Sequence, residues 1–308
     1  MILKKLIKVI VILLIIIFLF IMGLSIYASN YLYDYTLNSH SDKNLFEHVD
    51  IDEEKKQKAY DWLEKNSQNV SIINDNLKLH GYYIQQTSHV YMIMVHGYRS
   101  DASGIISPIK QMKKKGYNLL IPDLRGHGKS EGDYIGMGWD DRKDILKWID
   151  FILKKDKDAS IVLYGVSMGG ATVMNVAGEK LPSQVKVIIE DCGYTSAWDM
   201  IKTHIDMQGL QSDVALHMAS LITYLRAGYL IEDVEPIKQV KKSKTPILFI
   251  HGDQDDFVPF AMLEQLYDAA KCEKQKLVIH GAGHADCYSV GGKEYYQTIF
   301  DFIQRYIK

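Results

Sequence analysis

Residues 160–170 read Ser-Ile-Val-Leu-Tyr-Gly-Val-Ser-Met-Gly-Gly, and this stretch decides the fold. It begins with an apolar run at 161–164, passes through a Gly-x-Ser-x-Gly motif around Ser167, and leads directly into a helical pattern over 168–180. A strand that turns so sharply into a helix strains the backbone at the serine, tolerates only small neighbours and exposes the hydroxyl above the sheet. A glycine-rich packing turn is the alternative, but the position between strand and helix favours a nucleophile.

Outward from this turn, short apolar runs alternate with amphipathic stretches. The runs that predict strands are 71–74, 77–84, 90–95, 119–122, 161–164, 185–190, 247–250 and 276–279, and the patterns that predict helices lie near 103–115, 141–155, 168–180, 260–271 and 293–306. Strands that alternate with helices of about 10–15 residues imply a mostly parallel sheet with helices on both faces. The sequence therefore predicts an α/β fold over residues 70–308.

One stretch breaks the alternation, because no apolar run typical of a strand occurs between residues 191 and 246. Apolar side chains recur there at helical spacing, namely Val214, Met218, Leu221, Ile222 and Leu225. An insertion after a strand of a parallel sheet lies over the ligand crevice at the carboxyl ends of the strands. We expect residues 194–240 to form a small helical cap.

A serine hydroxyl needs a base to take its proton and an acid to orient that base, and in folds of this kind the chain order is Ser, acid, His. The histidines after Ser167 are His204, His217, His251, His280 and His284. The first two lie in the predicted cap, and the next two end strands, where a ring more often packs than reacts. His284, in a glycine-rich loop, is the predicted base; a plain loop histidine is the alternative.

Three carboxylates follow the strand run 247–250, and they are Asp253, Asp255 and Asp256. Asp255 is the predicted acid, with the other two as turn and cap residues, and Asp191 is the less favoured substitute. Closely spaced aspartates also bind calcium, but this loop lacks the longer series of ligands that such sites use. We therefore expect no metal here.

A serine that attacks a carbonyl carbon also needs backbone N–H donors, because the carbonyl oxygen becomes an oxyanion during the attack. The residue after the nucleophile, Met168, supplies the first donor. Tyr98, after the strand run 90–95 and next to Gly97, supplies the predicted second, since glycine allows a close backbone turn. His96 is interpreted as a residue that orders this loop.

The N-terminal region differs from the rest of the chain. Residues 9–33 carry no charge, and Lys4, Lys5 and Lys8 precede them, whereas no Lys or Arg follows until Lys43. About 20 apolar residues span a bilayer as a helix, and the flanking lysines favour a cytoplasmic N-terminus. We expect a stub and transmembrane anchor at 1–33, a helical linker at 34–69 and an extracytoplasmic domain at 70–308. A secreted protein with a cleaved signal peptide is the alternative.

Composition limits the remaining classes. A net charge of -2 in 308 residues gives no sign of a nucleic-acid partner. The three cysteines, Cys192, Cys272 and Cys287, are odd in number and widely spaced, which argues against a disulfide framework or zinc site. No cofactor is expected, because the side chains and amides above are sufficient for hydrolysis.

With these residues assembled, the chain from about 70 to 308 resembles the alpha/beta hydrolase superfamily, in particular bacterial membrane-anchored members related to serine aminopeptidases and acylaminoacyl-peptidase-like hydrolases. The matching stretches are 95–97, 122–130, 165–170, 250–259 and 281–285. The resemblance implies the alpha/beta hydrolase fold and places the acid three residues after Gly252, at Asp255. It implies that the loop containing Arg125 and His127 shapes the sheet edge without a catalytic role.

The predicted function is hydrolysis of a carboxylic ester through an acyl-enzyme. Apolar cap side chains could line an acyl pocket or form the cap's own core; they are Met200, Met207, Leu210, Met218 and Leu221. Together with the anchor, they suggest medium-chain or lipid-derived acyl substrates. An amidase or peptidase with the same residues is one alternative, and a non-catalytic binding protein that keeps the fold is another.

Overall fold

The computed structural model describes residues 2–42, 52–207, 209 and 213–307. Eight strands form one sheet in the order β1-β2-β4-β3-β5-β6-β7-β8. The strands are β1 Gln68–Asn74, β2 Leu77–Ile84, β3 Val90–Val95, β4 Asn118–Pro122, β5 Ser160–Val166, β6 Val185–Asp191, β7 Ile247–Gly252 and β8 Lys274–Ile279. Strand β2 is antiparallel to both of its neighbours, and the other adjacent pairs are parallel. The predicted mostly parallel sheet is confirmed.

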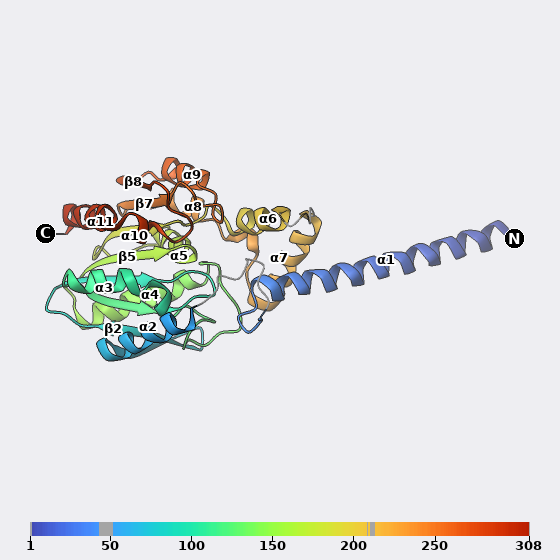
Figure 1. The fold of residues 1–308 in the computed structure, drawn as a ribbon. Helices are drawn as coiled ribbons and strands as arrows, with labels where there is room; N and C mark the ends of the chain where they lie inside the picture. The colour runs from blue at the N-terminus through green and yellow to red at the C-terminus, as the bar shows by residue number, and fades with distance from the viewer. Residues whose placement is uncertain (1, 43–51, 208, 210–212, 308) are drawn as a thin grey trace.

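Helices cover both faces of the sheet (Figure 1). One face packs against α4 Asp141–Lys155, α5 Met168–Ala177 and α9 Ala261–Ala269, and the other against α2 Glu53–Asn66, α3 Ile106–Lys114 and α11 Gly292–Tyr306. Strand β3 shows the consequence, because Ile93 packs on the first face while Met92 and Met94 pack on the second. Burial on both sides explains why the central strands are continuous apolar runs rather than alternating ones.

The segment between β6 and β7 contains α6 Ala197–Met207, α7 Asp213–Ala227, the short 3-10 helix η2 Ile231–Asp233 and α8 Pro236–Val240, and none of its described residues forms a strand. The apolar side chains at helical spacing between residues 214 and 225 predicted a helix where α7 lies. Three of these side chains, however, point away from the protein core. Val214, Leu221 and Leu225 are 71%, 52% and 77% exposed. Of these three, only Leu221 was a candidate for the cap's own core, and its exposure does not fit that alternative.

Helix α1 Ile2–Thr36 extends away from the rest of the molecule (Figure 1). It is long and apolar enough to cross a membrane, with a mean hydropathy of 3.4 over a window in which no residue is buried. The end of α1 and the residue that follows it behave differently, since Tyr33 and Leu37 are 2% and 0% exposed and belong to the same core as α4 and α5. Part of the segment predicted as a linker thus packs into the domain.

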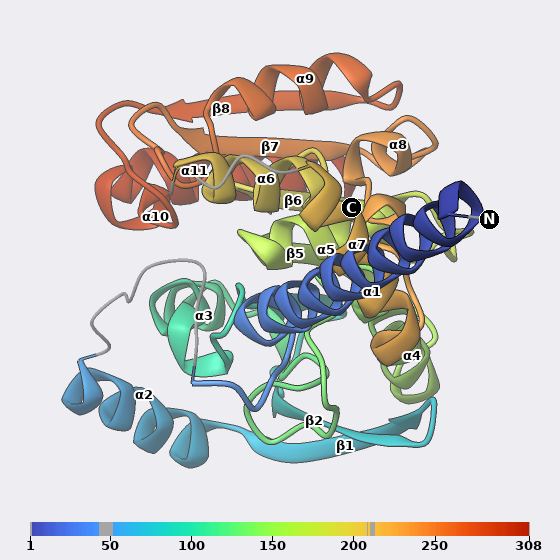
Figure 2. The same cartoon turned by 90° about the vertical axis from the view of Figure 1, so that its right-hand side faces the viewer.

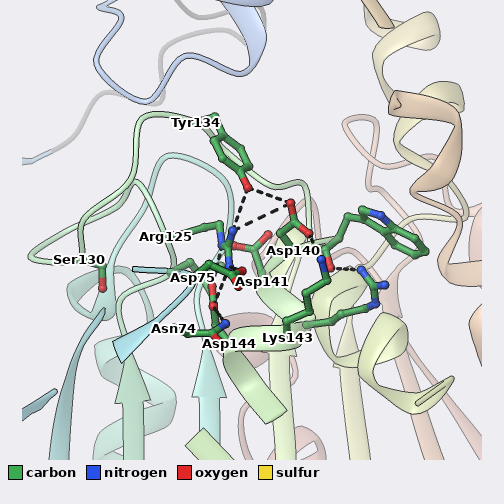
Figure 3. A network of polar contacts seen from close by, with 12 residues as sticks. Asn74, Asp75, Arg125, Ser130, Tyr134, Asp140, Asp141, Lys143 and Asp144 are labelled. Atoms are coloured by element: carbon green, nitrogen blue, oxygen red, sulfur yellow. Dashed lines mark hydrogen bonds and ion pairs between the residues drawn. The ribbon is translucent and has the colours of Figure 1, made fainter. Parts of the chain in front are cut away.

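Arg125 is a buried cation in the loop after β4 (Figure 3). Its Nε and Nη2 donate to both carboxylate oxygens of Asp144 in α4, at 2.7 and 2.8 Å. Its Nη1 donates to the hydroxyl of Tyr134 at 2.8 Å, and that hydroxyl donates to Asp140 at 2.8 Å. These bonds join the loop after β4 to the start of α4, so Arg125 stabilises the fold.

Arg125→Ala should lower the free energy of unfolding by about 3–5 kcal/mol, because it leaves the Asp144 carboxylate buried without its partner. Lys129→Ala is the control, since Lys129 lies in the same loop but pairs with Glu64 at a half-exposed site, and its loss should cost at most about 1 kcal/mol. Denaturant unfolding of both variants measures the difference. Equal effects would contradict the assignment of Arg125 to the fold's framework.

Candidate functional site

Ser167 lies at the junction of β5 and α5, where the sequence predicted a strained turn. Its φ of 57° and ψ of -120° place it in the left-handed region, which costs a non-glycine residue conformational energy. A Cβ on Gly165 would lie 2.1 Å from the carbonyl oxygen of Gly169, and a Cβ on Gly169 would lie 2.2 Å from that of Val95. Only glycine fits at either position, so the motif is required by the close packing of α5 against β3 and β5.

The loop after β8 brings His284 to this serine. The Nε2 atom of His284 lies 2.8 Å from Ser167 Oγ, and its Nδ1 atom lies 2.8 Å from Asp255 Oδ2. The ring of Phe257 packs against the imidazole, with 4.5 Å between the ring centroids. When Nδ1 donates its hydrogen to the carboxylate, Nε2 is free to accept the hydroxyl proton. The structure thus brings the three predicted residues into one hydrogen-bonded series.

Asp255 is held from two sides in the loop after β7. Its Oδ1 accepts hydrogen bonds from the amides of Phe257 at 3.0 Å and Val258 at 2.8 Å. Burial raises the pKa of this carboxyl, but bonds from His251 and His284 outweigh burial and lower the pKa to about 2. The group is therefore an anion throughout the neutral range, which suits it to orient an imidazole and stabilise its positive charge.

His251 is a contributor that the sequence did not identify. It was interpreted as a packing ring at the end of a strand, and it is fully buried. Its Nε2 nevertheless lies 3.2 Å from Asp255 Oδ2 and 3.0 Å from the carbonyl oxygen of Val258. A histidine at the end of a strand does not by itself predict this contact. Asp255 lies over the His251 ring only because the loop after β7 folds back.

The other candidate carboxylates have different partners. Asp191 Oδ2 accepts a hydrogen bond from the Tyr295 hydroxyl at 2.7 Å, and burial raises its pKa. Asp253 accepts from the amide of Gly281 at 2.7 Å and contacts His280 at 2.8 Å, which ties together the loops after β7 and β8. The Nδ1 atom of His284 contacts Asp255 instead of either of these carboxylates.

The two predicted oxyanion donors border the serine. Met168 begins α5, so its amide lies at a helix N-terminus, where N–H groups point outward and the dipole favours negative charge. A Cβ on Gly97 would lie 3.4 Å from Ser167 Cβ, so the peptide linking Gly97 to Tyr98 runs past the nucleophile. Both amides thus belong to segments adjacent to the hydroxyl.

Two histidines order the loop that carries Tyr98. His96 Nδ1 donates to the carbonyl oxygen of Gly97 at 2.8 Å, and its Nε2 accepts from the amide of Leu124 at 3.0 Å. His127 Nε2 accepts from the amide of Arg99 at 3.2 Å, and burial lowers the pKa of His127 to about 3. Both rings are therefore neutral and connect the loops after β3 and β4.

The proposed acyl-pocket residues are dispersed. Met200 is 2% exposed and packs in the core. Met207 and Leu221 are exposed, Met218 is half-buried, and Leu210 lies outside the described residues. The structure therefore gives no support to Met200 as a pocket wall and leaves the other assignments as predictions.

Cys192 lies beside this series without a predicted role. Its sulfur and the ligand atoms of Asp255 and His284 lie within 4.8 Å of one another, a spacing that could suit a metal ion. Burial raises the thiol pKa well above its usual value, whereas a metal ligand must be a thiolate. Both ring nitrogens of His284 also have hydrogen-bond partners. The donor set thus suits the Ser-His-Asp series better than a metal.

Two family models match this chain. The family described as "Serine aminopeptidase, S33" matches residues 86–193, and "Serine hydrolase (FSH1)" matches residues 163–285. The uncharacterized protein YqkD of Bacillus subtilis is 26% identical over 214 residues, which is 69% of this chain and 70% of YqkD. The alpha/beta hydrolase domain-containing protein WAV2 of Arabidopsis thaliana is 27% identical over 249 residues, covering 76% and 77% of the two chains.

Solved structures share the architecture. An esterase of Pyrococcus furiosus has a TM-score of 0.66 at 22% identity and covers 80% of this chain and 94% of its own. An acylaminoacyl peptidase of Pyrococcus horikoshii has a TM-score of 0.60 at 19% identity, with 79% and 42% covered. At these identities the likeness concerns the fold, and it confirms the fold predicted from the sequence.

Gly169→Ala should sharply reduce folded protein or lower the thermal midpoint by well over 5 °C, since its Cβ would collide with backbone that cannot move aside. Gly283→Ala is the matched control. Its added Cβ would meet its nearest neighbour at 3.9 Å, so the midpoint should stay near that of wild type. Differential scanning fluorimetry compares the two; a stable Gly169→Ala protein would show that the turn is looser than described.

Proposed function

Because this chain belongs to the alpha/beta hydrolase superfamily and is a serine hydrolase, we propose that it cleaves a carboxylic ester, with Ser167 as nucleophile, His284 as base and Asp255 as acid. The observation that carries the proposal is the position of His284. Its two nitrogens lie within hydrogen-bond distance of Ser167 Oγ and Asp255 Oδ2 at the same time. A base so placed can take the hydroxyl proton without reorienting.

The mechanism follows from these contacts. His284 removes the proton as Ser167 Oγ attacks the ester carbonyl, and the carboxylate of Asp255 stabilises the resulting imidazolium. The amides of Met168 and Tyr98 stabilise the oxyanion of the tetrahedral intermediate. The imidazolium then protonates the leaving alcohol, and the acyl group stays on Ser167. Water, activated by the same imidazole, releases the acid and restores the serine.

An amidase or peptidase uses the same steps and is the alternative. The esterase of Pyrococcus furiosus and the acylaminoacyl peptidase share the fold with this chain at 22% and 19% identity, so they support a hydrolase of either kind. The ester is the proposed substrate because the apolar cap residues and the anchor suggest an acyl group from lipid. A medium-chain or lipid-derived acyl group remains part of the proposal.

A fluorophosphonate probe should label the wild-type protein but not Ser167→Ala. Ser160→Ala, at the other end of β5, is the matched control and should label normally. Turnover of p-nitrophenyl butyrate should fall by at least roughly 10⁴-fold in Ser167→Ala and in His284→Ala, with little change in the thermal midpoint. Faster hydrolysis of aminoacyl p-nitroanilides than of the ester would favour the amidase, and no labelling of folded wild type would favour a non-catalytic binding protein.

We also propose that α1 is an uncleaved anchor, with its lysine-rich end in the cytoplasm and the hydrolase domain outside. The apolar run is longer than the 7–15 residues of a typical signal-peptide core, and the three lysines precede it. The end of α1 packs into the domain through Tyr33 and Leu37, which suits a helix that stays attached. A secreted form that has lost the helix is the alternative.

Protease added to intact cells should therefore remove the hydrolase domain, leaving a small membrane-embedded fragment detectable through a tag on the lysine-rich end. The tag itself should become accessible only after permeabilisation. Full protection of the domain in intact cells, with cleavage after permeabilisation, would show the opposite topology, and recovery of a soluble tag-free domain from the medium would favour secretion.

A further inference from the structure

The edge of the sheet that carries the proposed catalytic residues is also the edge from which α1 leaves the molecule (Figures 1 and 2). Carboxyl ends of parallel strands meet at one edge, and Ser167 and Asp255 follow β5 and β7 there. Tyr98 follows β3 at the same edge, and its hydroxyl donates to the carbonyl oxygen of Thr36, the last residue of α1, at 2.5 Å. The site and the base of the helix are therefore neighbours.

Residues 36–41, called the strap from here on, fix the direction of α1 relative to the domain. Arg99 donates through Nη1 to the carbonyl oxygen of Ser41 at 2.6 Å and through Nη2 to that of Asn38 at 3.0 Å. The amide of Ile135 donates to the carbonyl oxygen of Leu37 at 2.8 Å. With its end bonded to the loops after β3 and β4, the helix cannot act as a flexible tether.

Helix α7 packs beside the last turns of α1, as both views show (Figures 1 and 2). Arg226 of α7 forms an ion pair with Asp34 at 3.0 Å, and its guanidinium lies 4.0 Å from the ring centroid of Tyr33. Further toward the lysine-rich end, Tyr27 and Tyr31 are 70% and 45% exposed, as expected of aromatic side chains at a membrane interface. Helix α7 thus lies close to the level at which α1 would enter the bilayer.

The outer face of α7 has the polarity of a membrane-contacting helix. The buried residues of α7 are at most 1% exposed; three of them, Ala219, Ser220 and Thr223, are small or polar, and one, Leu216, is apolar. Val214 and Leu225, on the opposite side, are 71% and 77% exposed, together with Leu221. A helix covered only by water would not place three large apolar side chains together on its outer face. Helix α7 contacts α1, whose apolar side chains are also exposed, and this contact points to the bilayer as the partner of the outer face of α7.

We propose that the outer face of α7, defined by Val214, Leu221 and Leu225, lies in the interface of the bilayer that α1 spans, and that the enzyme takes its acyl ester from that membrane. The inference rests on the proposed ester hydrolysis and on α1 as an anchor. A substrate dissolved in the lipid would reach Ser167 along the cap without crossing bulk water. Apolar burial at the interface drives such contact without a requirement for basic residues.

The surface is tested on the full-length chain reconstituted into phosphatidylcholine vesicles. A fluorophore is attached at Leu225→Cys, and for comparison at Lys157→Cys, which lies at the amino end of β5 on the opposite edge. Both use a Cys272→Ser background, since Cys192 and Cys287 are buried. Doxyl-labelled lipid should quench the Leu225 probe at least about threefold more than the Lys157 probe. Equal quenching would overturn the proposal, as would concentration-dependent pairing of two copies without lipid quenching.

The substrate source is tested with two fluorogenic esters, 4-methylumbelliferyl oleate within the vesicles and 4-methylumbelliferyl acetate in water. In a combined Val214→Gln and Leu225→Gln variant, the ratio of oleate to acetate turnover should fall by about tenfold or more. Ile73→Gln, an exposed apolar residue of β1 that is 66% accessible, should leave the ratio unchanged. Parallel loss on both esters would overturn membrane delivery. A wild-type protein inactive on both esters would refute ester hydrolysis itself. The lipid-quenching experiment would still show whether the outer face of α7 contacts the membrane.

Discussion

The position of Ser167 depends on the contact between the first turn of α5 and the end of β3. At this point backbone meets backbone, with the carbonyl oxygen of Val95 where any side chain on Gly169 would have to lie. The contact holds the serine in a left-handed conformation, aims its hydroxyl away from the sheet and sets the amide of Met168 beside it. The loops that bring Gly97, Asp255 and His284 to the site are attached to strands whose spacing follows from the same packing.

Much of this arrangement could be predicted from the sequence, because strands buried on both faces appear in it as continuous apolar runs. Strands β2 and β3 begin and end where the apolar runs do, and the other six extend at most three residues further at either end. The order of serine, acid and histidine along the chain, together with the positions of the candidates in loops after strands, selected residues that the structure places in hydrogen-bond distance of one another. A strand-turn-helix with glycines on both sides of a serine has few structural solutions, and this restriction made the prediction specific.

Other features could not be predicted because their signals are absent from side-chain patterns. Periodicity shows that Val214, Leu221 and Leu225 share one face of a helix, but not that this face points outward. The strap is bonded through the carbonyl oxygens of Thr36, Asn38 and Ser41, and every residue type has such an oxygen. The contact of His251 with Asp255 depends on the path of a loop, which local sequence does not determine.

The burial of Tyr33 and Leu37 has a consequence for how such proteins diversify. With α1 as the proposed anchor, the chain passes from lipid to the interior of the folded domain within the last turns of the helix and the residue that follows it. Exchange of membrane segments between relatives would have to conserve these last turns or exchange the surfaces of α7 and of the loops after β3 and β4 with them. Under the anchor proposal, the N-terminal helix and the hydrolase domain form one structural unit.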